Sequence, residues 1–151
     1  MIELREAILQ DMDLLFEWAN DSLVRKNSFN QKPISYNDHK IWFEKMMCNP
    51  DTKQFILLVD KKPVGQARIT IDGEKAEIGY SIASDERGKG YGHSIIKLLV
   101  DKVSSDYANI TCLVAKVKPE NGASRRLFES EKFENTFLCY ELNIRNSDVD
   151  L

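Results

Sequence analysis

A glycine-rich turn between an expected strand and an expected helix constrains this chain most. Residues 76–83 read AEIGYSIA, and residues 87–92 read RGKGYG and open an amphipathic helix. Glycines at alternate positions remove the Cβ atoms that would hold the backbone away from a ligand. The free N–H groups of the first helical turn point at that ligand with the positive end of the helix dipole. The pattern predicts a phosphate-binding loop and favours a pyrophosphate-bearing cofactor.

Hydrophobic periodicity and turn signals predict alternating helices and strands on both sides of this loop. Asp72-Gly73 is a strong hairpin signal, because the turn needs a positive φ, and it joins the second and third strands of an expected meander. In chain order we expect a strand over 2–5, helices over 11–20 and 35–48, strands over 55–59, 64–71 and 76–83, a helix after the glycines, a strand over 110–117, a helix over 121–131 and a strand over 133–144.

Composition indicates one soluble domain over residues 1–151, with a frayed tail from about residue 145. The chain is 42% apolar and 30% charged, and its net charge of −3 without a long basic block disfavours nucleic acid and anionic membranes as partners. We find no export signal and no apolar window long enough for a membrane span.

Cys48, Cys112 and Cys139 lack paired metal-ligand spacing, so we expect reduced cytoplasmic thiols and no metal site. Cys112 lies in the expected strand over 110–117, so we expect it to be buried.

The element order and the fixed positions Arg87, Gly90 and Gly92 resemble the GNAT superfamily of acetyl-CoA-dependent N-acetyltransferases, over nearly the whole chain. The resemblance implies a mixed α/β fold with a largely antiparallel, splayed central sheet and helices on both faces. It also implies acetyl-CoA as co-substrate. A dinucleotide-binding fold would instead require G-x-G-x-x-G early in a parallel βαβ unit. A glycine-rich turn without any ligand is the simplest alternative.

The resemblance also assigns roles around the cofactor. The strand before the loop would splay from its neighbour, so that the N–H of Ile82 faces the thioester carbonyl and stabilises the oxyanion. Asn121 matches the family asparagine that contacts the cofactor. The residues expected to hold the pyrophosphate, mainly through backbone N–H groups with added charge from the first and third, are Arg87, Gly88, Lys89, Gly90, Tyr91, Gly92 and His93.

Glu77 is the candidate general base, because an alkylammonium must lose a proton before it attacks a thioester. It lies in an otherwise apolar strand, where burial would raise its proton affinity. The alternatives are an outward-facing carboxylate in phase with Gly79 and Ser81, and a base that acts through water.

The group that protonates the departing thiolate is left open. Phe128 occupies the position where the family often has a tyrosine, and a phenyl ring cannot donate a proton. Ser124 or a water would then do so, or the thiolate leaves as the anion. Tyr80 and Tyr91 are substitutes that the sequence does not rank.

The acceptor site is expected in the N-terminal half, from Arg25, Phe29, Asn30, His39 and Trp42. A polar segment facing a helix with histidine and tryptophan suits a sugar or nucleotide. The stretch is similar to acetyltransferases of bacterial surface-sugar synthesis, such as the pseudaminic acid pathway, which implies a UDP-linked amino sugar as acceptor.

Several alternatives remain on the acceptor side. Trp42 could be a core anchor and His39 an ordinary helix residue. The acceptor could be another small amine, a protein N-terminus or a lysine. A noncatalytic acyl-CoA sensor is the alternative from another class. The sequence does not specify the oligomeric state, for which a homodimer is one candidate.

Overall fold

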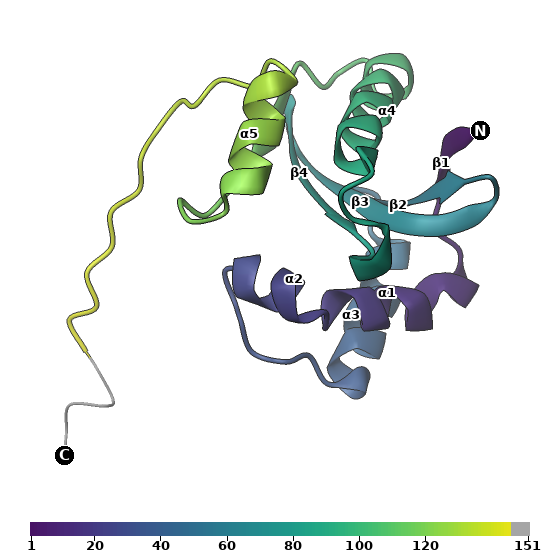
Figure 1. The fold of residues 1–151 in the computed structure, drawn as a ribbon, viewed down its shortest axis with the longest axis horizontal. Coiled ribbons are helices and arrows are strands. Elements are labelled where there is room, and N and C mark those ends of the chain that lie inside the picture. Colours follow the sequence, from purple (N-terminus) through teal and green to yellow (C-terminus); the bar gives the residue numbers. More distant parts are fainter. Residues whose placement is uncertain (146–151) are drawn as a thin grey trace.

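The computed structural model describes residues 1–145 and contains one five-stranded sheet (Figure 1). Its neighbours follow chain order, with β1 to β4 antiparallel and β5 parallel to β4. The strands are β1 (Ile2–Glu6), β2 (Thr52–Val59), β3 (Lys62–Asp72), β4 (Lys75–Ile82) and β5 (Cys112–Ala115). The expected meander is confirmed, and Gly73 takes the positive φ, 62°, that its turn requires.

The helices form two layers, one on each face of the sheet (Figure 1). One layer contains η1 (Leu9–Asp11), α1 (Met12–Ala19), α2 (Ser22–Asn27) and α3 (Tyr36–Cys48). The other contains α4 (Tyr91–Asp106) and α5 (Gly122–Ser130), and a short turn η2 (Ser84–Glu86) leads from β4 toward α4. This arrangement confirms the mixed α/β fold expected from the sequence.

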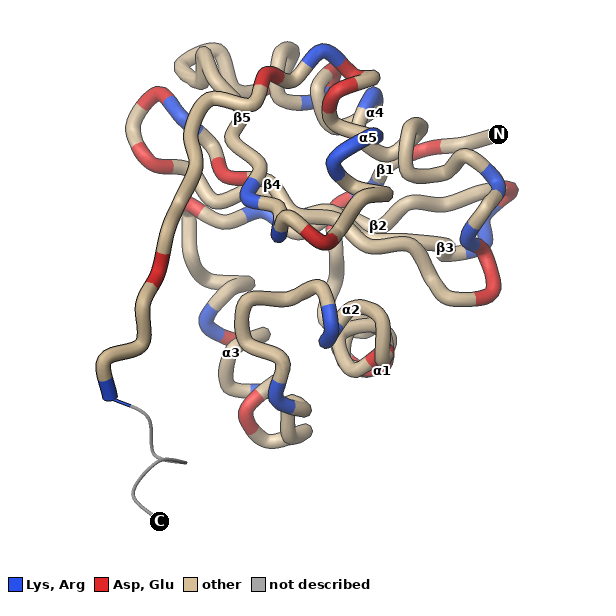
Figure 2. Tube along the Cα trace, turned by 60° about the vertical axis from the view of Figure 1, so that its left-hand side comes forward, with Lys and Arg blue, Asp and Glu red and all other residues tan. Residues whose placement is uncertain are grey.

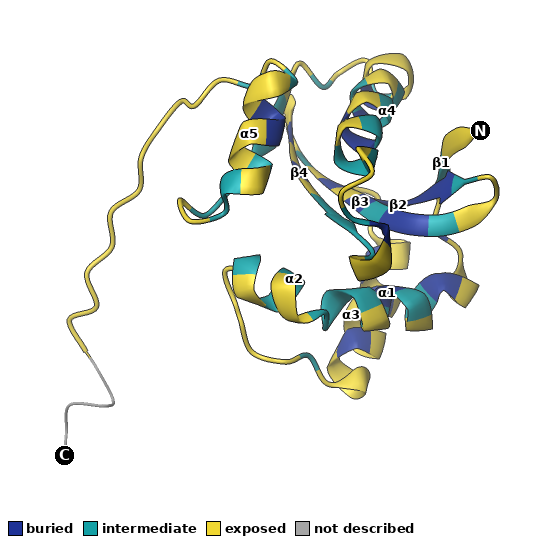
Figure 3. Ribbon diagram, viewed as in Figure 1, coloured by how far each residue is buried: buried dark blue, intermediate teal, exposed yellow. Residues whose placement is uncertain are grey.

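Strand β2 contributes side chains to both hydrophobic cores, because successive side chains of a strand point to opposite faces of the sheet. Phe55 and Leu57 pack in the core beneath α4 and α5, whereas Ile56 and Leu58 pack in the core with α1 and α3. All four are buried, so β2 reads as a continuous apolar run and lacks the alternation of a half-exposed strand (Figure 3).

Helix α2 was not expected from the sequence. It spans only residues 22–27, too few to show a helical period, and depends on Asp21 as its N-cap. The Asp21 carboxylate accepts hydrogen bonds from the N–H groups of Leu23 and Val24, both at 3.1 Å. Those bonds satisfy donors that a helix start leaves free.

The expected strand over 133–144 is wrong for this structure. The N–H of Phe133 donates to the carbonyl of Phe128 at 2.9 Å, and the chain then runs away from the domain with exposed side chains (Figure 3). A strand requires a neighbouring ladder, and no strand in residues 1–145 pairs with this segment. The expected tail falls mostly on residues 146–151, which lie outside the described residues.

The remaining expectations concern β5 and the charges. Strand β5 is shorter than the expected strand over 110–117, and Cys112 is exposed, contrary to its expected burial. Basic and acidic residues are interspersed along the trace (Figure 2). Among residues 1–145, no helix has the length and apolar character to cross a bilayer, and no three metal-ligating side chains cluster.

Candidate active site

Strands β4 and β5 separate after a short contact. Their pairing covers only residues 75–78 of β4 and 112–115 of β5, although β4 continues to Ile82. At one end, the N–H of Thr111 donates to the Glu74 carbonyl at 2.7 Å. At the other, the N–H of Ala83 donates to Val64 in β3 at 2.8 Å. Since backbone groups alternate in direction along a strand, the N–H of Ile82 faces the opening between β4 and β5.

The glycine loop lies at the end of this opening and presents unsatisfied N–H groups. Gly88 and Gly90 have φ values of 80° and 83°, a region that glycine occupies without the strain of a Cβ. Within the described chain, no backbone N–H of residues 87–93 donates to a protein acceptor. The first bond of α4 is from Ser94 to the Gly90 carbonyl at 3.3 Å. The loop is therefore a cradle of free donors at a helix N-terminus.

Gly92 serves packing rather than conformation. A Cβ at this position would lie 3.3 Å from Cδ2 of Leu127 and 3.8 Å from the ring of Tyr80. The absence of a side chain lets the first turn of α4 approach α5 and β4 closely.

The basic side chains of the loop are already paired. Arg87 donates from Nη2 to Asp21 at 2.7 Å and from Nε to the Ile82 carbonyl at 3.1 Å. Burial alone would raise the pKa of Asp21, but the hydrogen bonds from Arg87 and from the α2 backbone lower it. Lys89 lies 3.0 Å from the buried Glu86 carboxylate. These contacts fix the shape of the cradle, while its backbone N–H groups remain free.

Glu77 faces outward from β4, which is one of the alternatives that the sequence left open, and it is not buried. Its side chain is 52% exposed and lies 3.0 Å from the ammonium group of Lys116. It shares its face of β4 with Gly79 and Ser81, because the inward positions of the strand are Ala76 and Ile78. The carboxylate is therefore ion-paired and accessible to water.

A pair of hydroxyl groups joins β4 to α5. The Tyr80 hydroxyl lies 2.9 Å from Oγ of Ser124, and Asn121 caps α5 by accepting from the Ser124 N–H at 3.2 Å. Burial raises the pKa of Tyr80, and its hydrogen bond with Ser124 partly opposes that shift. Phe128 lies beside them in the core, with its ring edge-on to Tyr80. Of the two tyrosines left unranked by the sequence, Tyr80 contacts Ser124.

Three of the expected acceptor residues, Arg25, Asn30 and His39, have internal hydrogen-bond partners. Arg25 donates to the carbonyls of Ala19 and Asn30 at 2.7 and 2.8 Å, which ties the segment after α2 to α1. His39 is buried, and its Nε2 donates to the Met12 carbonyl at 2.9 Å. Phe29 is exposed.

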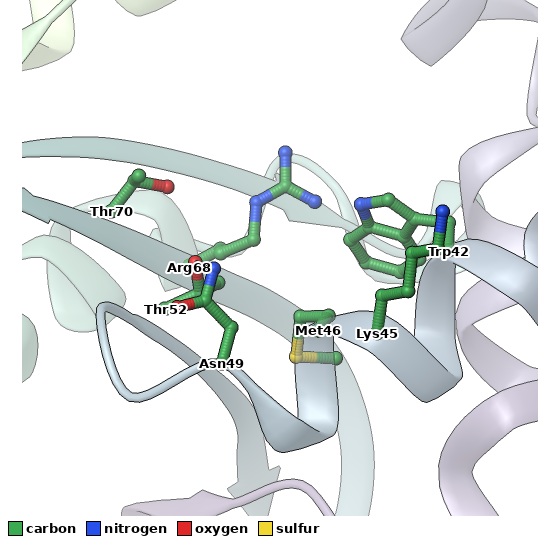
Figure 4. Close-up of a pocket in the computed structure, with 7 residues that line it drawn as sticks. All are labelled: Trp42, Lys45, Met46, Asn49, Thr52, Arg68 and Thr70. Atoms are coloured by element: carbon green, nitrogen blue, oxygen red, sulfur yellow. Dashed lines mark hydrogen bonds between the residues drawn. The ribbon is translucent and has the colours of Figure 1, made fainter.

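Trp42 lines a hollow on the sheet face that carries Glu77. The hollow holds about 240 Å³ and lies between α3 and strands β2 and β3 (Figure 4). Its walls are Trp42, Lys45, Met46, Asn49, Thr52, Arg68 and Thr70. Sequence reasoning missed Arg68 and Thr70, although strand alternation around the buried Ile69 places both on the face opposite the core beneath α4.

Free amides at a helix N-terminus beside an opened strand pair define a protein that binds an activated, pyrophosphate-bearing substrate. Residues 2–134 match the model of the acetyltransferase (GNAT) domain family. A curated relative, the uncharacterized N-acetyltransferase p20 of Bacillus licheniformis, is 26% identical over 142 residues, which cover 88% of this chain and 79% of the relative.

Solved structures show the same fold. Spermidine N-acetyltransferase from Vibrio cholerae, solved with CoA and spermine, has a TM-score of 0.83 at 21% identity, covering 95% of this chain and 88% of its own. Aminoglycoside acetyltransferase AAC(6')-Ib, solved with coenzyme A, has a TM-score of 0.78 at 20% identity, covering 90% and 86%.

The chain therefore belongs to the GNAT acetyltransferase family. It is an acetyl-CoA-dependent acyltransferase, and acetyl-CoA is its co-substrate.

Proposed function

We propose that this enzyme transfers the acetyl group of acetyl-CoA directly to a primary amine in a ternary complex, and that the acceptor is a nucleotide-linked amino sugar of the UDP type. The observation that carries the transfer is the set of free N–H groups at residues 87–93 beside the opening between β4 and β5. Arg87, Gly88, Lys89, Gly90, Tyr91, Gly92 and His93 hold the pyrophosphate in this proposal. Asn121 and Ser124 border the site from α5.

The N–H of Ile82 stabilises the oxyanion that forms as the amine attacks the thioester. Its direction toward the strand opening supports this role, because a fixed main-chain donor needs no reorganisation when charge develops. The pantetheine would lie along the unpaired part of β4 like an added strand.

Glu77 accepts the proton of the acceptor ammonium in this mechanism. Its exposure and its ion pair with Lys116 favour transfer through a water molecule over direct contact. A positioned base of this kind contributes roughly 10²- to 10⁴-fold to the rate.

Ser124 protonates the departing thiolate, oriented by Tyr80. The buried phenol stays protonated across the working pH range, since burial raises its pKa, so it can donate to Ser124. Ser124 passes its proton to the thiolate and takes the proton of Tyr80 in the same step, so that no serine alkoxide remains, and solvent then reprotonates Tyr80.

Turnover distinguishes this proposal from its alternatives. Release of free CoA thiol is measured with acetyl-CoA alone and with amino-sugar nucleotides, other small amines and peptides as acceptors. Release that requires an amino-sugar nucleotide supports the proposal, and release with peptides alone favours a protein N-terminus or lysine. Stabilisation by acetyl-CoA without any productive acceptor favours a noncatalytic acyl-CoA sensor.

The base is tested with Glu77→Gln, which keeps the shape and removes the proton acceptor. We expect kcat/KM to fall and its rise with pH to move toward the pKa of the acceptor amine, which must then lose its proton to solvent, while the affinity for CoA stays unchanged. A pH profile equal to that of the wild type would remove Glu77 from the role.

We also propose a cytoplasmic homodimer in which the segment 133–145 of each copy adds to the β5 edge of the other. Leu138, Tyr140, Leu142 and Ile144 recur at every second residue and are all exposed, which is the pattern of a strand with one apolar face. Strand β5 is the last strand of the sheet, so its outer edge has no strand partner within residues 1–145. One chain thus presents both an unpaired edge and an unpaired strand.

A further inference from the structure

The hollow between α3 and the sheet is lined by hydrogen-bond donors and carries positive charge. Lys45 approaches from α3 and Arg68 from β3, and Thr52 and Thr70 add hydroxyl groups (Figure 4). The lining contains no aspartate or glutamate. The Asn49 amide is engaged internally, because its Nδ2 donates to Thr52 at 3.3 Å and its Oδ1 accepts from the Asp51 N–H at 2.9 Å.

Arg68 is held in place without using its donors. Its guanidinium carbon lies 5.0 Å from the centroid of the Trp42 ring, which is a cation–π contact. Within residues 1–145, the guanidinium donates to no protein acceptor and forms no ion pair, and Lys45 likewise forms none.

Arg68 stays charged although its surroundings lower its pKa. The residue as a whole is exposed at the mouth of the hollow, yet nearby protein atoms desolvate the guanidinium and lower the pKa of Arg68, while the negative charge of Glu77 raises it. A guanidinium remains protonated at any working pH despite such shifts. The nearest carboxylate across the strands, Glu77, is already paired with Lys116.

Arg68, which lines the hollow, lies on β3, the neighbour of the strand β4 that carries the proposed transfer point, Ile82. Arg68 pairs in register with Gly79, three residues before Ile82 on β4. At the rise of a strand, this separation is about 10 Å. A ligand of modest length can therefore occupy the hollow and still present an amine near Ile82.

We propose that the hollow binds an oxyanion, a phosphate or a carboxylate, of an acceptor that stacks on Trp42 and places its amine about 10 Å away toward Ile82. This inference rests on the proposed acetyl transfer and narrows its acceptor class. Arginine matches both oxyanions with two parallel N–H groups, and Lys45 adds a second charge. A polyamine would instead bring a cation against two cations, which disfavours it electrostatically.

Four acceptors of equal chain length test the charge preference: 6-aminohexyl phosphate, 6-aminohexanoate, hexylamine and 1,6-diaminohexane. We expect kcat/KM to be highest for the two anionic probes and lowest for the diamine. The phosphate and carboxylate arms show which oxyanion is preferred. Equal or greater activity with hexylamine or the diamine would overturn the proposal.

Two variants locate the preference in the hollow. Arg68→Gln should reduce the ratio of kcat/KM for 6-aminohexyl phosphate to that for hexylamine by about 10- to 100-fold, as expected for a lost charge-assisted hydrogen bond. Lys45→Gln should reduce it in the same direction, and serves if the Arg68 variant does not fold. Lys40→Gln removes the same charge from the exposed surface of α3 and should leave the ratio unchanged. An unchanged ratio in both hollow variants contradicts the proposal.

Binding separates this inference from the acetyl transfer itself. Calorimetric titration with 6-aminohexyl phosphate is done on the wild type and on Lys45→Gln. If no amine is acetylated but the phosphate binds the wild type and binds the variant more weakly, the hollow is an oxyanion site and the proposed transfer is wrong. If the phosphate binds neither, or both equally, the oxyanion assignment is wrong.

Discussion

Replacing Gly90 by alanine separates the conformational role of the glycine loop from its role in stability. Gly90 caps α4 with a φ of 83°, and a Cβ there would meet no atom within 4 Å. The substitution therefore adds no steric clash with protein atoms, and its effect on the protein itself comes from forcing a residue with a side chain into the left-handed region. That strain is about 1–2 kcal/mol.

Whether this strain lowers the stability of the fold or the affinity for CoA depends on whether other contacts hold the backbone at residue 90. The N–H groups of residues 87–93 have no protein acceptor, so without CoA the loop of the variant can relax to a negative φ at small cost. CoA must then restore the positive φ, so the strain appears in binding. Because 1.4 kcal/mol is tenfold in affinity, the Kd for CoA should rise about 5- to 30-fold.

Gly73 is the matched control. It has a φ of 62° and equally open surroundings, but it lies in the β3–β4 turn, where the strand ladders hold the backbone. Gly73→Ala should therefore lower the Tm by about 2–8 °C and leave the Kd for CoA unchanged. Calorimetric titration with CoA and thermal unfolding are measured for both variants. If Gly90→Ala binds CoA as the wild type does, the amide cradle does not carry the cofactor.

Three further predictions concern other parts of the molecule. Ser124→Ala should lower kcat with little change in the affinity for CoA, and a wild-type kcat would show that the thiolate leaves unprotonated. Asp11→Asn should lower the free energy of unfolding by about 1–3 kcal/mol at pH 7, because Asp11 accepts two hydrogen bonds from Arg5. The pKa of Asp11 is lowered in the folded protein, chiefly by those hydrogen bonds. The contribution of Asp11 to the free energy of unfolding is therefore fully present above its unfolded pKa of about 4, and is lost as the pH falls through its lower folded pKa. In urea unfolding, the free energies of unfolding of the wild type and of Asp11→Asn should thus differ at pH 7 and converge in acid. A difference that does not change with pH would contradict the reasoning. Leu142→Glu, on the apolar face of the C-terminal segment, should convert the dimer to a monomer in light scattering, whereas Asn143→Glu on the opposite face should not. A wild-type monomer would refute the exchange of strands.

Local signals predicted most of the fold. The Asp72-Gly73 turn, the apolar run 55–59 and the helical period after the glycines each depend on neighbours in sequence, and the structure has a hairpin, a buried strand and α4 at these places. The segment 133–144 has an equally good strand pattern but no strand. Periodicity reports which face is apolar, whereas a strand also requires an edge with which to pair.

The candidate site could be predicted only where the backbone determines it. Glycine permits the positive φ that Gly88 and Gly90 adopt, so the loop could be recognised from its residue types. The pairing of Arg87 with Asp21, 66 positions apart, could not, because no local pattern records which residue meets a long side chain. For the same reason the hollow around Arg68 was missed, and the sequence left open whether Glu77 is buried among its apolar neighbours or faces outward with Gly79 and Ser81.

In the proposed mechanism, the distribution of paired and unpaired charge divides the site between its two substrates. At the cofactor end, Arg87 and Lys89 are bound to Asp21 and Glu86, so the pyrophosphate is left to main-chain amides, which bind it through geometry and the helix dipole. At the proposed acceptor end, Arg68 and Lys45 have no carboxylate partner within the described chain, so side-chain charge remains available there. Main-chain amides fixed in a loop suit a co-substrate that stays the same. The side chains of Arg68 on β3 and Lys45 on α3 can be substituted to suit another acceptor without changing the loop that holds the co-substrate.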